Sequence, residues 1–164
     1  MKKVGIVMGS DSDLSVVEKS ITTLENLGIP FEVHVYSAHR TPNEAHDFTL
    51  NAKKRDFGVI IGAAGKAAHL AGVLAASTCL PVIGLPIKSS TMDGLDSLLS
   101  TVQMPGGIPV ATVAINGAEN AALLAAEILA INDDSLYEKL AKLREDNKNK
   151  VLEKNKKIEE KYNK

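Results

Sequence analysis

The sequence predicts an α/β fold: a three-layer sandwich with a five-stranded parallel sheet of order 2-1-3-4-5 and helices on both faces. Five short runs rich in β-branched residues alternate with stretches of helical spacing. Four of these runs are apolar almost throughout, which is typical of strands in a parallel sheet that is covered on both sides. Alternating strand and helix units then indicate a doubly wound sheet with right-handed connections. The 164 residues suit a single domain.

The elements follow one another in a regular order along the chain. Strands are expected at 3–8, 31–37, 57–63, 81–87 and 110–115, and helices at 14–29, 42–54, 66–78, 93–103 and 118–130. The first helix shows the reasoning, because apolar residues recur at helical spacing from Val17 through Ile21 to Leu24 and the run stops at Gly28. Residues 1–133 are therefore assigned to the α/β domain.

Residues 134–164 are predicted to form a helical extension of the same domain. Ser135 and Glu138 have the spacing of a capping box, and a stripe of leucines follows as far as Leu143. Beyond Asn147 the chain is rich in Lys, Glu and Asn, so the helix is expected to leave the domain and fray. Its apolar stripe could dock on its own core or on another subunit.

Composition excludes several classes of function. The formal net charge is −1, so no general attraction to nucleic acid or to an anionic membrane is expected. Cys79 is the only cysteine, which rules out an internal disulfide and a thiolate-rich metal site within one chain. The histidines do not share a helix face at ligand spacing, so no metal is expected. No apolar run approaches a membrane span or a secretion signal, and a cytoplasmic protein is the expectation.

Ligands of doubly wound sheets bind beyond the carboxyl ends of the strands, where the strand order reverses. Loops 9–13, 37–41 and 62–66 should border that crevice. In the first loop, Ser10, Ser12 and the amides of a helix N-terminus offer donors to an anion, and Asp13 could accept hydrogen bonds from a sugar diol. The same residue types also serve as helix caps, and both interpretations stay open.

The second loop places His39 and Arg40 just before a marked helix start. Thr41 has the N-cap position, Pro42 is the first helical residue and Glu44 completes a capping box. Capping needs neither His39 nor Arg40. A guanidinium suits phosphate binding, and an imidazole can give and take a proton near neutral pH. The alternative is that both are ordinary solvated loop residues.

The third loop is rich in small residues, which would let a ligand approach the bare backbone around Gly65. Lys66 is expected near a helix N-terminus, where the helix dipole disfavours a cation and a bound anion would relieve it. The segment is not a P-loop, because Ile60 and Ala67 stand where that motif needs Gly and Ser or Thr. His69, in the first helical turn, would by itself suit a structural hydrogen bond.

These loops, in this order, resemble a known family. "GSDSD" (9–13), "SAHRTP" (37–42) and "AAHLAG" (67–72), followed by "QMPGGIPV" (103–110), are similar to the N5-carboxyaminoimidazole ribonucleotide mutases of de novo purine biosynthesis, in their bacterial class. The resemblance runs from Lys3 to about Ala130. Lys66 stands where many relatives have Gly, which leaves open which group meets the migrating carboxylate.

The resemblance implies a flavodoxin-like fold, a homo-octamer and an isomerase that uses no metal, biotin or ATP. The carboxylate would move from the exocyclic nitrogen to carbon 4 of the imidazole. His39 matches the catalytic histidine, Asp13 the ribose ligand and Arg40 a residue near the phosphate. The matching positions for substrate binding are Ser10, Ser12, Asp13, Ser37, Arg40, Ala64, Gly65, Lys66, His69 and Leu70.

Two other functions fit the same fold. One is a related carboxylase that adds free carbon dioxide to aminoimidazole ribonucleotide. The other is a flavodoxin-like binding module without catalysis, because sandwiches of this kind host many functions. The His39–Arg40 pair at the strand-order reversal favours the enzyme.

Overall fold

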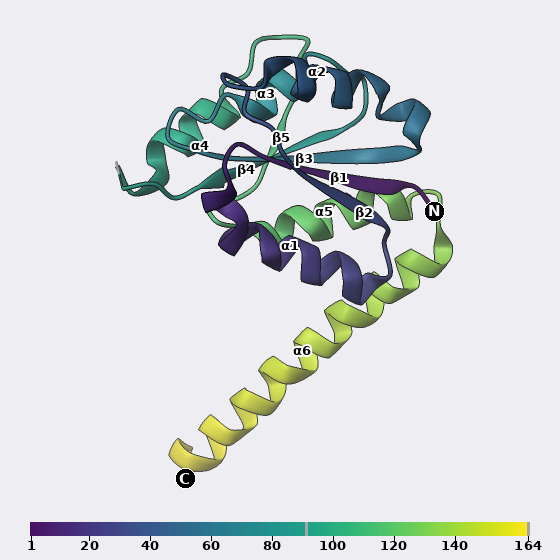
Figure 1. Cartoon of the computed structure of the whole chain (residues 1–164). Coiled ribbons are helices and arrows are strands. Elements are labelled where there is room, and N and C mark those ends of the chain that lie inside the picture. Colours follow the sequence, from purple (N-terminus) through teal and green to yellow (C-terminus); the bar gives the residue numbers. More distant parts are fainter. Residues whose placement is uncertain (91, 164) are drawn as a thin grey trace.

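A computed structural model describes residues 1–90 and 92–163 and confirms the predicted sheet (Figure 1). Five parallel strands lie in the order β2-β1-β3-β4-β5. Their bounds are β1 (Lys3–Met8), β2 (Phe31–Val35), β3 (Phe57–Gly65), β4 (Val82–Ile87) and β5 (Ala111–Thr112). All five carboxyl ends meet at one edge, and the strand order reverses between β1 and β3, so the predicted crevice is on this edge.

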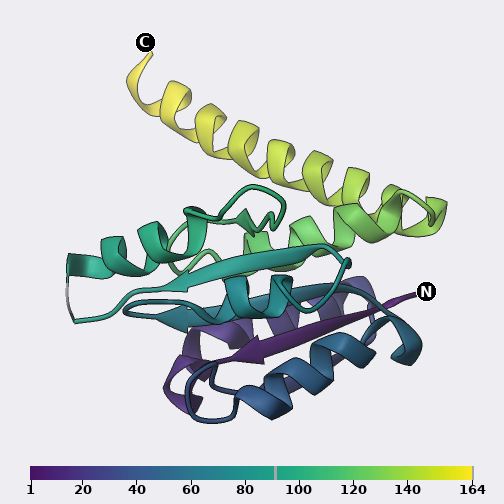
Figure 2. The same ribbon diagram turned by 90° about the horizontal axis from the view of Figure 1, so that it is seen from above.

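The helices cover both faces of the sheet (Figures 1 and 2). One face carries α1 (Leu14–Leu27) and α5 (Ala118–Ala130), and the other carries α2 (Pro42–Asn51), α3 (Leu70–Ala75) and α4 (Leu95–Val102). Short 3-10 turns, η1 (Asp11–Asp13), η2 (Lys53–Arg55) and η3 (Met92–Gly94), complete the connections. This distribution follows from right-handed crossovers in a sheet that is wound outward in two directions.

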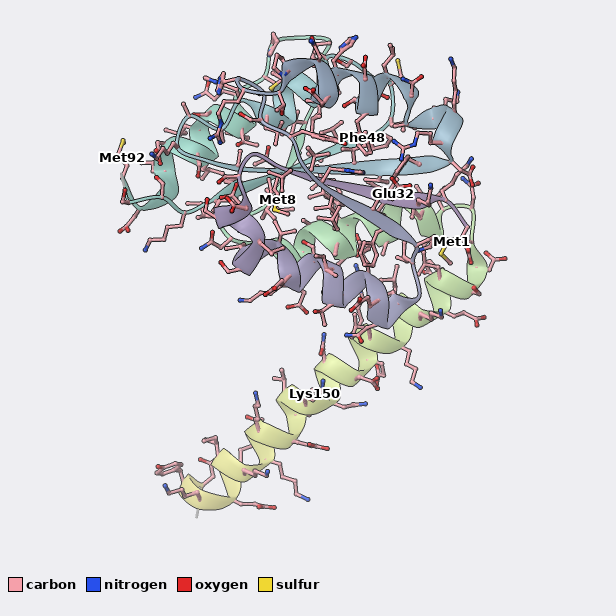
Figure 3. The ribbon with its side chains drawn as sticks, in the orientation of Figure 1. Met1, Met8, Glu32, Phe48, Met92 and Lys150 are labelled. Atoms are coloured by element: carbon pink, nitrogen blue, oxygen red, sulfur yellow. The ribbon has the colours of Figure 1, made fainter. Side chains whose placement is uncertain are left out.

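Each face of the sheet has its own hydrophobic core. On the α1–α5 side, Ile6 and Ile61 are fully buried and pack with the buried alanines of α5. Small side chains let that helix lie close to the sheet, as the scarcity of aromatic residues suggests. On the opposite face the ring of Phe48, labelled in Figure 3, lies over Gly5, where an added Cβ would come within 2.8 Å of it.

Three predicted elements, β3, α3 and β5, have clearly different bounds. β3 continues through Gly65 because Ala64 and Gly65 still pair with Pro86 and Ile87 of β4. As a result α3 spans Leu70–Ala75 rather than 66–78, and Lys66 lies in the preceding loop. β5 is also shorter than the predicted 110–115 and keeps only two residues of ladder with β4.

The final helix, α6 (Asp134–Tyr162), leaves the domain as one long rod (Figure 1). Its predicted cap was wrong: Asp133, not Ser135, accepts a hydrogen bond from the amide of Leu136 at 3.0 Å. The helix also does not fray after Asn147 but continues to Tyr162. Only its base is buried, and the part around Lys150 projects away from the sheet (Figure 3). No helix in the described part of the chain is long and apolar enough to cross a membrane.

Candidate active site

The carboxyl ends of the strands enclose a pocket of about 820 Å³. Loops after β1, β2, β3 and β4 form its walls. All of the residues predicted from the sequence line it, namely Ser10, Ser12, Asp13, Ser37, His39, Arg40, Ala64, Gly65, Lys66, His69 and Leu70. A second hollow of about 720 Å³, walled by residues 75–82 and part of 107–111, is mainly apolar and contains no histidine, acid or base apart from Cys79. The first pocket is therefore the candidate site.

The β1 loop presents two hydroxyls and a buried carboxyl. Ser10 caps η1, because its Oγ accepts hydrogen bonds from the amide of Ser12 at 3.3 Å and from its hydroxyl at 3.0 Å. Asp13 is the N-cap residue of α1, yet its side chain makes no cap hydrogen bond. The sequence left open whether these residues cap a helix or bind a ligand. The side chain of Ser10 does act as a cap, whereas the carboxyl of Asp13 does not.

Asp13 is only 8% exposed although it borders the pocket. Burial raises the pKa of its carboxyl, and the negative charge of Asp11 adds to that rise. Hydrogen bonds with the Ser10 backbone and the Ser12 side chain lower the pKa again in part. A desolvated acceptor of this kind is well suited to hydroxyl donors of a bound ligand, which would replace the lost water.

The β2 loop is a hydrogen-bonded turn that projects two side chains into the pocket. The Oγ of Ser37 accepts from the amides of His39 at 3.3 Å and Arg40 at 3.2 Å. Thr41 occupies the predicted N-cap position but does not cap α2 with its side chain. Its Oγ1 instead accepts from the amide of Ser37 at 2.8 Å, so the hydroxyl tightens the turn rather than the helix. The expected capping box is therefore absent.

Arg40 lies beside the β1 loop. Its Nη2 donates to the carbonyl of Gly9 at a long 3.4 Å, and the residue is exposed. One weak contact leaves most donors of the guanidinium directed to solvent or to a ligand. Arg40, which contacts the β1 loop, and the hydroxyls of Ser10 and Ser12 all line the pocket, and this combination suits an anion such as phosphate.

His39 and His69 come from different loops and meet directly. The Nε2 of His39 lies 3.0 Å from the Nδ1 of His69, and the rings are nearly perpendicular at 84°. A hydrogen bond between two imidazole nitrogens needs a proton on one and a lone pair on the other. The contact therefore exists only while at least one of the two rings is neutral. His69 has the structural bond expected for it, and its partner is the candidate acid and base.

The β3 loop brings backbone and one cation to the pocket. Ala64 and Gly65 end the strand, and Leu70 closes the base with 2% exposure. Lys66 has a φ of 56°, a left-handed conformation that costs energy for a residue with a side chain. Because α3 begins only at Leu70, the expected conflict between Lys66 and a helix dipole does not arise.

Sequence analysis did not predict the fourth wall of the pocket, which is formed by Ile87 at the end of β4 and by residues 88–90 after it. The signal was present in the strand order, since β4 lies beside β3 and its carboxyl end must reach the same edge. Lys88 forms an ion pair with Asp93 at 2.9 Å.

The two remaining histidines lie outside the pocket. His34 stacks on Tyr36 with ring centroids 5.0 Å apart and contacts Glu32 at 3.3 Å. His46 contacts the hydroxyl of Ser77 at 2.9 Å. Within residues 1–90 and 92–163, no three His, Cys, Asp or Glu side chains gather as metal ligands do.

Comparison with known proteins agrees with this geometry. A family model described as AIR carboxylase matches residues 3–150. An N5-carboxyaminoimidazole ribonucleotide mutase of Pyrococcus horikoshii is 56% identical over 157 residues, which cover 96% of this chain and 89% of that protein. A phosphoribosylaminoimidazole carboxylase of Saccharomyces cerevisiae is 51% identical over 156 residues, 95% of this chain but 27% of the relative.

The fold has a close counterpart among solved structures. Crystalline Treponema denticola PurE superimposes with a TM-score of 0.87 at 31% identity, covering 94% of this chain and 97% of that one. The flavodoxin-like architecture and the full set of pocket loops thus accompany extensive sequence identity. The chain belongs to the AIR carboxylase family.

Proposed function

We propose that this chain is an N5-carboxyaminoimidazole ribonucleotide mutase of de novo purine biosynthesis. It would move the carboxylate from the exocyclic nitrogen to carbon 4 of the imidazole, giving 4-carboxy-5-aminoimidazole ribonucleotide. The contact between His39 and His69 inside a pocket that Arg40 also lines is the observation that carries the proposal. The mutase of Pyrococcus horikoshii has nearly the length of this chain, whereas the yeast carboxylase is much longer.

The ribose phosphate would occupy the end of the pocket formed by the β1 and β2 loops. Arg40 and the hydroxyls of Ser10 and Ser12 hold the phosphate in this proposal, because a planar guanidinium can donate two parallel hydrogen bonds. The buried carboxyl of Asp13 accepts from the ribose hydroxyls. Ser37 keeps the turn in place through its bonds to the amides of His39 and Arg40.

His39 would act first as an acid and then as a base. In its cationic form it protonates the exocyclic nitrogen, which takes the electron pair of the breaking bond to the carboxyl carbon, and carbon dioxide leaves. Carbon 4 of the electron-rich ring then forms a bond to that carbon dioxide. Neutral His39 removes the proton from carbon 4, which restores the aromatic ring and the cation. The net reaction is an isomerisation that consumes neither an oxidant nor a phosphoryl donor.

Confinement of the carbon dioxide supplies much of the catalysis in this proposal. The backbone of Ala64 and Gly65 and the side chains of His69 and Leu70 form the wall against which the imidazole and carboxylate would lie. Keeping both reactants in contact makes recapture effectively unimolecular, which can contribute ~7–11 kcal/mol. The carbon dioxide released from the exocyclic nitrogen then reacts with carbon 4 before it can diffuse into bulk water.

The choice of carboxyl donor tests the proposal against the carboxylase. Purified protein would receive either N5-carboxyaminoimidazole ribonucleotide in buffer stripped of bicarbonate, or aminoimidazole ribonucleotide with added bicarbonate. Formation of the 4-carboxylated product is expected only with the first substrate. Product formed only from the second would assign the carboxylase instead. No product from either, in a yellow protein that carries flavin, would indicate the binding module.

Two further expectations concern the assembled protein and the C-terminal segment. We propose a cytoplasmic homo-octamer, whose mass by sedimentation would be about eight times the 17.4 kDa of one chain. Residues 134–164 would extend the same domain, because Leu136 and Leu140 at the base of α6 are buried in its core. A monomer at micromolar concentration would contradict the assembly.

A further inference from the structure

Two lysines on the β3–β4 side of the pocket have no part in the mechanism above. We infer that Lys88, together with Lys66, binds the carboxylate that the substrate carries, and so selects carboxylated ribonucleotides. This inference rests on the proposed function and deepens it. Phosphate binding by Arg40 and proton transfer by His39 do not require these two lysines.

The sheet places the two lysines at neighbouring strand ends. Gly65 and Ile87 form the last pair of the β3–β4 register, and one lysine follows each of them directly. Both lysines are exposed and both line the pocket. A lysine at each of two neighbouring strand ends makes this wall of the pocket attractive to an anionic ligand.

Lys88 is held in place by its backbone. Its amide donates to the Oδ1 of Asn116 at 2.9 Å, and the Asn116 amide donates to the carbonyl of Pro86 at 2.8 Å. Gly94 packs directly on it, because an added Cβ there would lie 3.0 Å from the Cα of Lys88. The main chain of Lys88 is thus fixed by Asn116 from another loop and by Gly94 from its own, so its side chain starts from a defined point at the pocket wall.

The ammonium of Lys88 already has a carboxylate partner that a ligand can replace. Asp93 lies 2.9 Å away, and the two side chains are 54% and 88% exposed. Exposed pairs contribute little net stability, so a substrate carboxylate that is better shielded from water can compete for the same cation. Asp93 has a φ of 55° and stands in a left-handed turn that holds it near the lysine before substrate arrives.

The charges of the pocket match those of the substrate. The ribonucleotide carries two anionic groups, a phosphate at one end and the migrating carboxylate at the other. The guanidinium of Arg40 reaches the β1 loop at the carbonyl of Gly9, whereas Lys88 follows β4, two strand spacings or roughly 10 Å along the sheet edge. The His39–His69 pair lies in the same pocket. A guanidinium for the phosphate and the two lysines for the carboxylate would fix the direction of the substrate.

Two ligands that differ only in the carboxylate test this inference. Calorimetry would give dissociation constants for 4-carboxy-5-aminoimidazole ribonucleotide and for aminoimidazole ribonucleotide, which shares its ribose phosphate. Lys88→Met should weaken the first by roughly 5- to 30-fold and the second by less than about 2-fold. Lys66→Asn, which tolerates the left-handed backbone, should act in the same direction. Lys88→Gln serves as a second variant if the Met variant folds poorly.

The controls separate this inference from the proposed function. Lys148→Met removes an exposed lysine that pairs with Glu145 on α6 and does not line the pocket, and it should change neither constant. Asp93→Asn should strengthen binding of the carboxylated ligand by about 2- to 3-fold, because the competing partner is lost. Equal losses for both ligands, or no loss for either, would overturn the inference while the mutase survives. A native protein that binds neither ligand would overturn both.

Discussion

Replacing His39 with Asn removes the acid and base while leaving a polar side chain in the same turn. The residue is exposed, so the substitution should change the free energy of unfolding by less than about 0.5 kcal/mol. General acid–base catalysis by one side chain is worth ~10²–10⁴-fold. Because His39 acts twice in one turnover, we expect kcat to fall by at least ~10³-fold, or about 4 kcal/mol. Its 3.0 Å contact with His69 is lost as well.

The assay combines kinetics with binding. Steady-state turnover of N5-carboxyaminoimidazole ribonucleotide gives kcat, and calorimetry with the 4-carboxylated product gives affinity, which should stay within a few-fold because the phosphate end is intact. His46→Asn is the matched control, since it breaks a 2.9 Å contact to Ser77 outside the pocket and should keep full activity. A His39→Asn enzyme with near-normal kcat would refute the role of this imidazole.

Three further changes test the rest of the account. Arg40→Met should weaken ribonucleotide affinity by ~10- to 100-fold, because charge-assisted hydrogen bonds are lost, and should reduce the salt dependence of that affinity. Calorimetry at two salt concentrations measures both effects, and an unchanged affinity would contradict the phosphate role of Arg40. Burial raises the pKa of Asp13, so this carboxyl favours folding below its unfolded pKa and loses that contribution as pH rises through its folded pKa. Asp13→Asn should therefore raise Tm at pH 7 yet weaken ribose binding, and a lower Tm would contradict the burial argument. Leu136→Ala at the buried base of α6 should lower the free energy of unfolding, measured with denaturant, by ~2–5 kcal/mol, whereas Val151→Ala at a 64% exposed position should hardly change it. Equal losses would contradict the packing of α6 on the domain core.

Much of the fold was predictable because its signals are local and agree with one another. Apolar strands of β-branched residues and a glycine that ends the first helix define the order of elements, and handedness then limits the topology. The predicted bounds were wrong where contacts between distant parts of the chain determine where an element begins or ends. The ladder with β4 extends β3 through Gly65 and so shortens α3. Similarly, Asp133 rather than Ser135 caps α6, since either residue type can serve and the backbone selects one.

Individual site residues could be predicted from the sequence where a loop contains reactive or charged side chains that have no structural role there. His39 and Arg40 are examples, since neither caps the helix that follows. The contact between His39 and His69 was not predictable, because it joins residues 30 apart and depends on how two loops meet. Lys88 was missed because its loop has no motif, although the strand order brings it to the pocket.

The fate of the carboxylate during turnover tests the central claim most directly. N5-carboxyaminoimidazole ribonucleotide with an isotopically labelled carboxylate would be converted in buffer that is saturated with unlabelled carbon dioxide. Confinement within the pocket predicts that nearly all of the label appears at carbon 4 of the product. Label diluted to the level of the dissolved gas would show that carbon dioxide escapes before recapture, which contradicts a transfer inside one enclosed site.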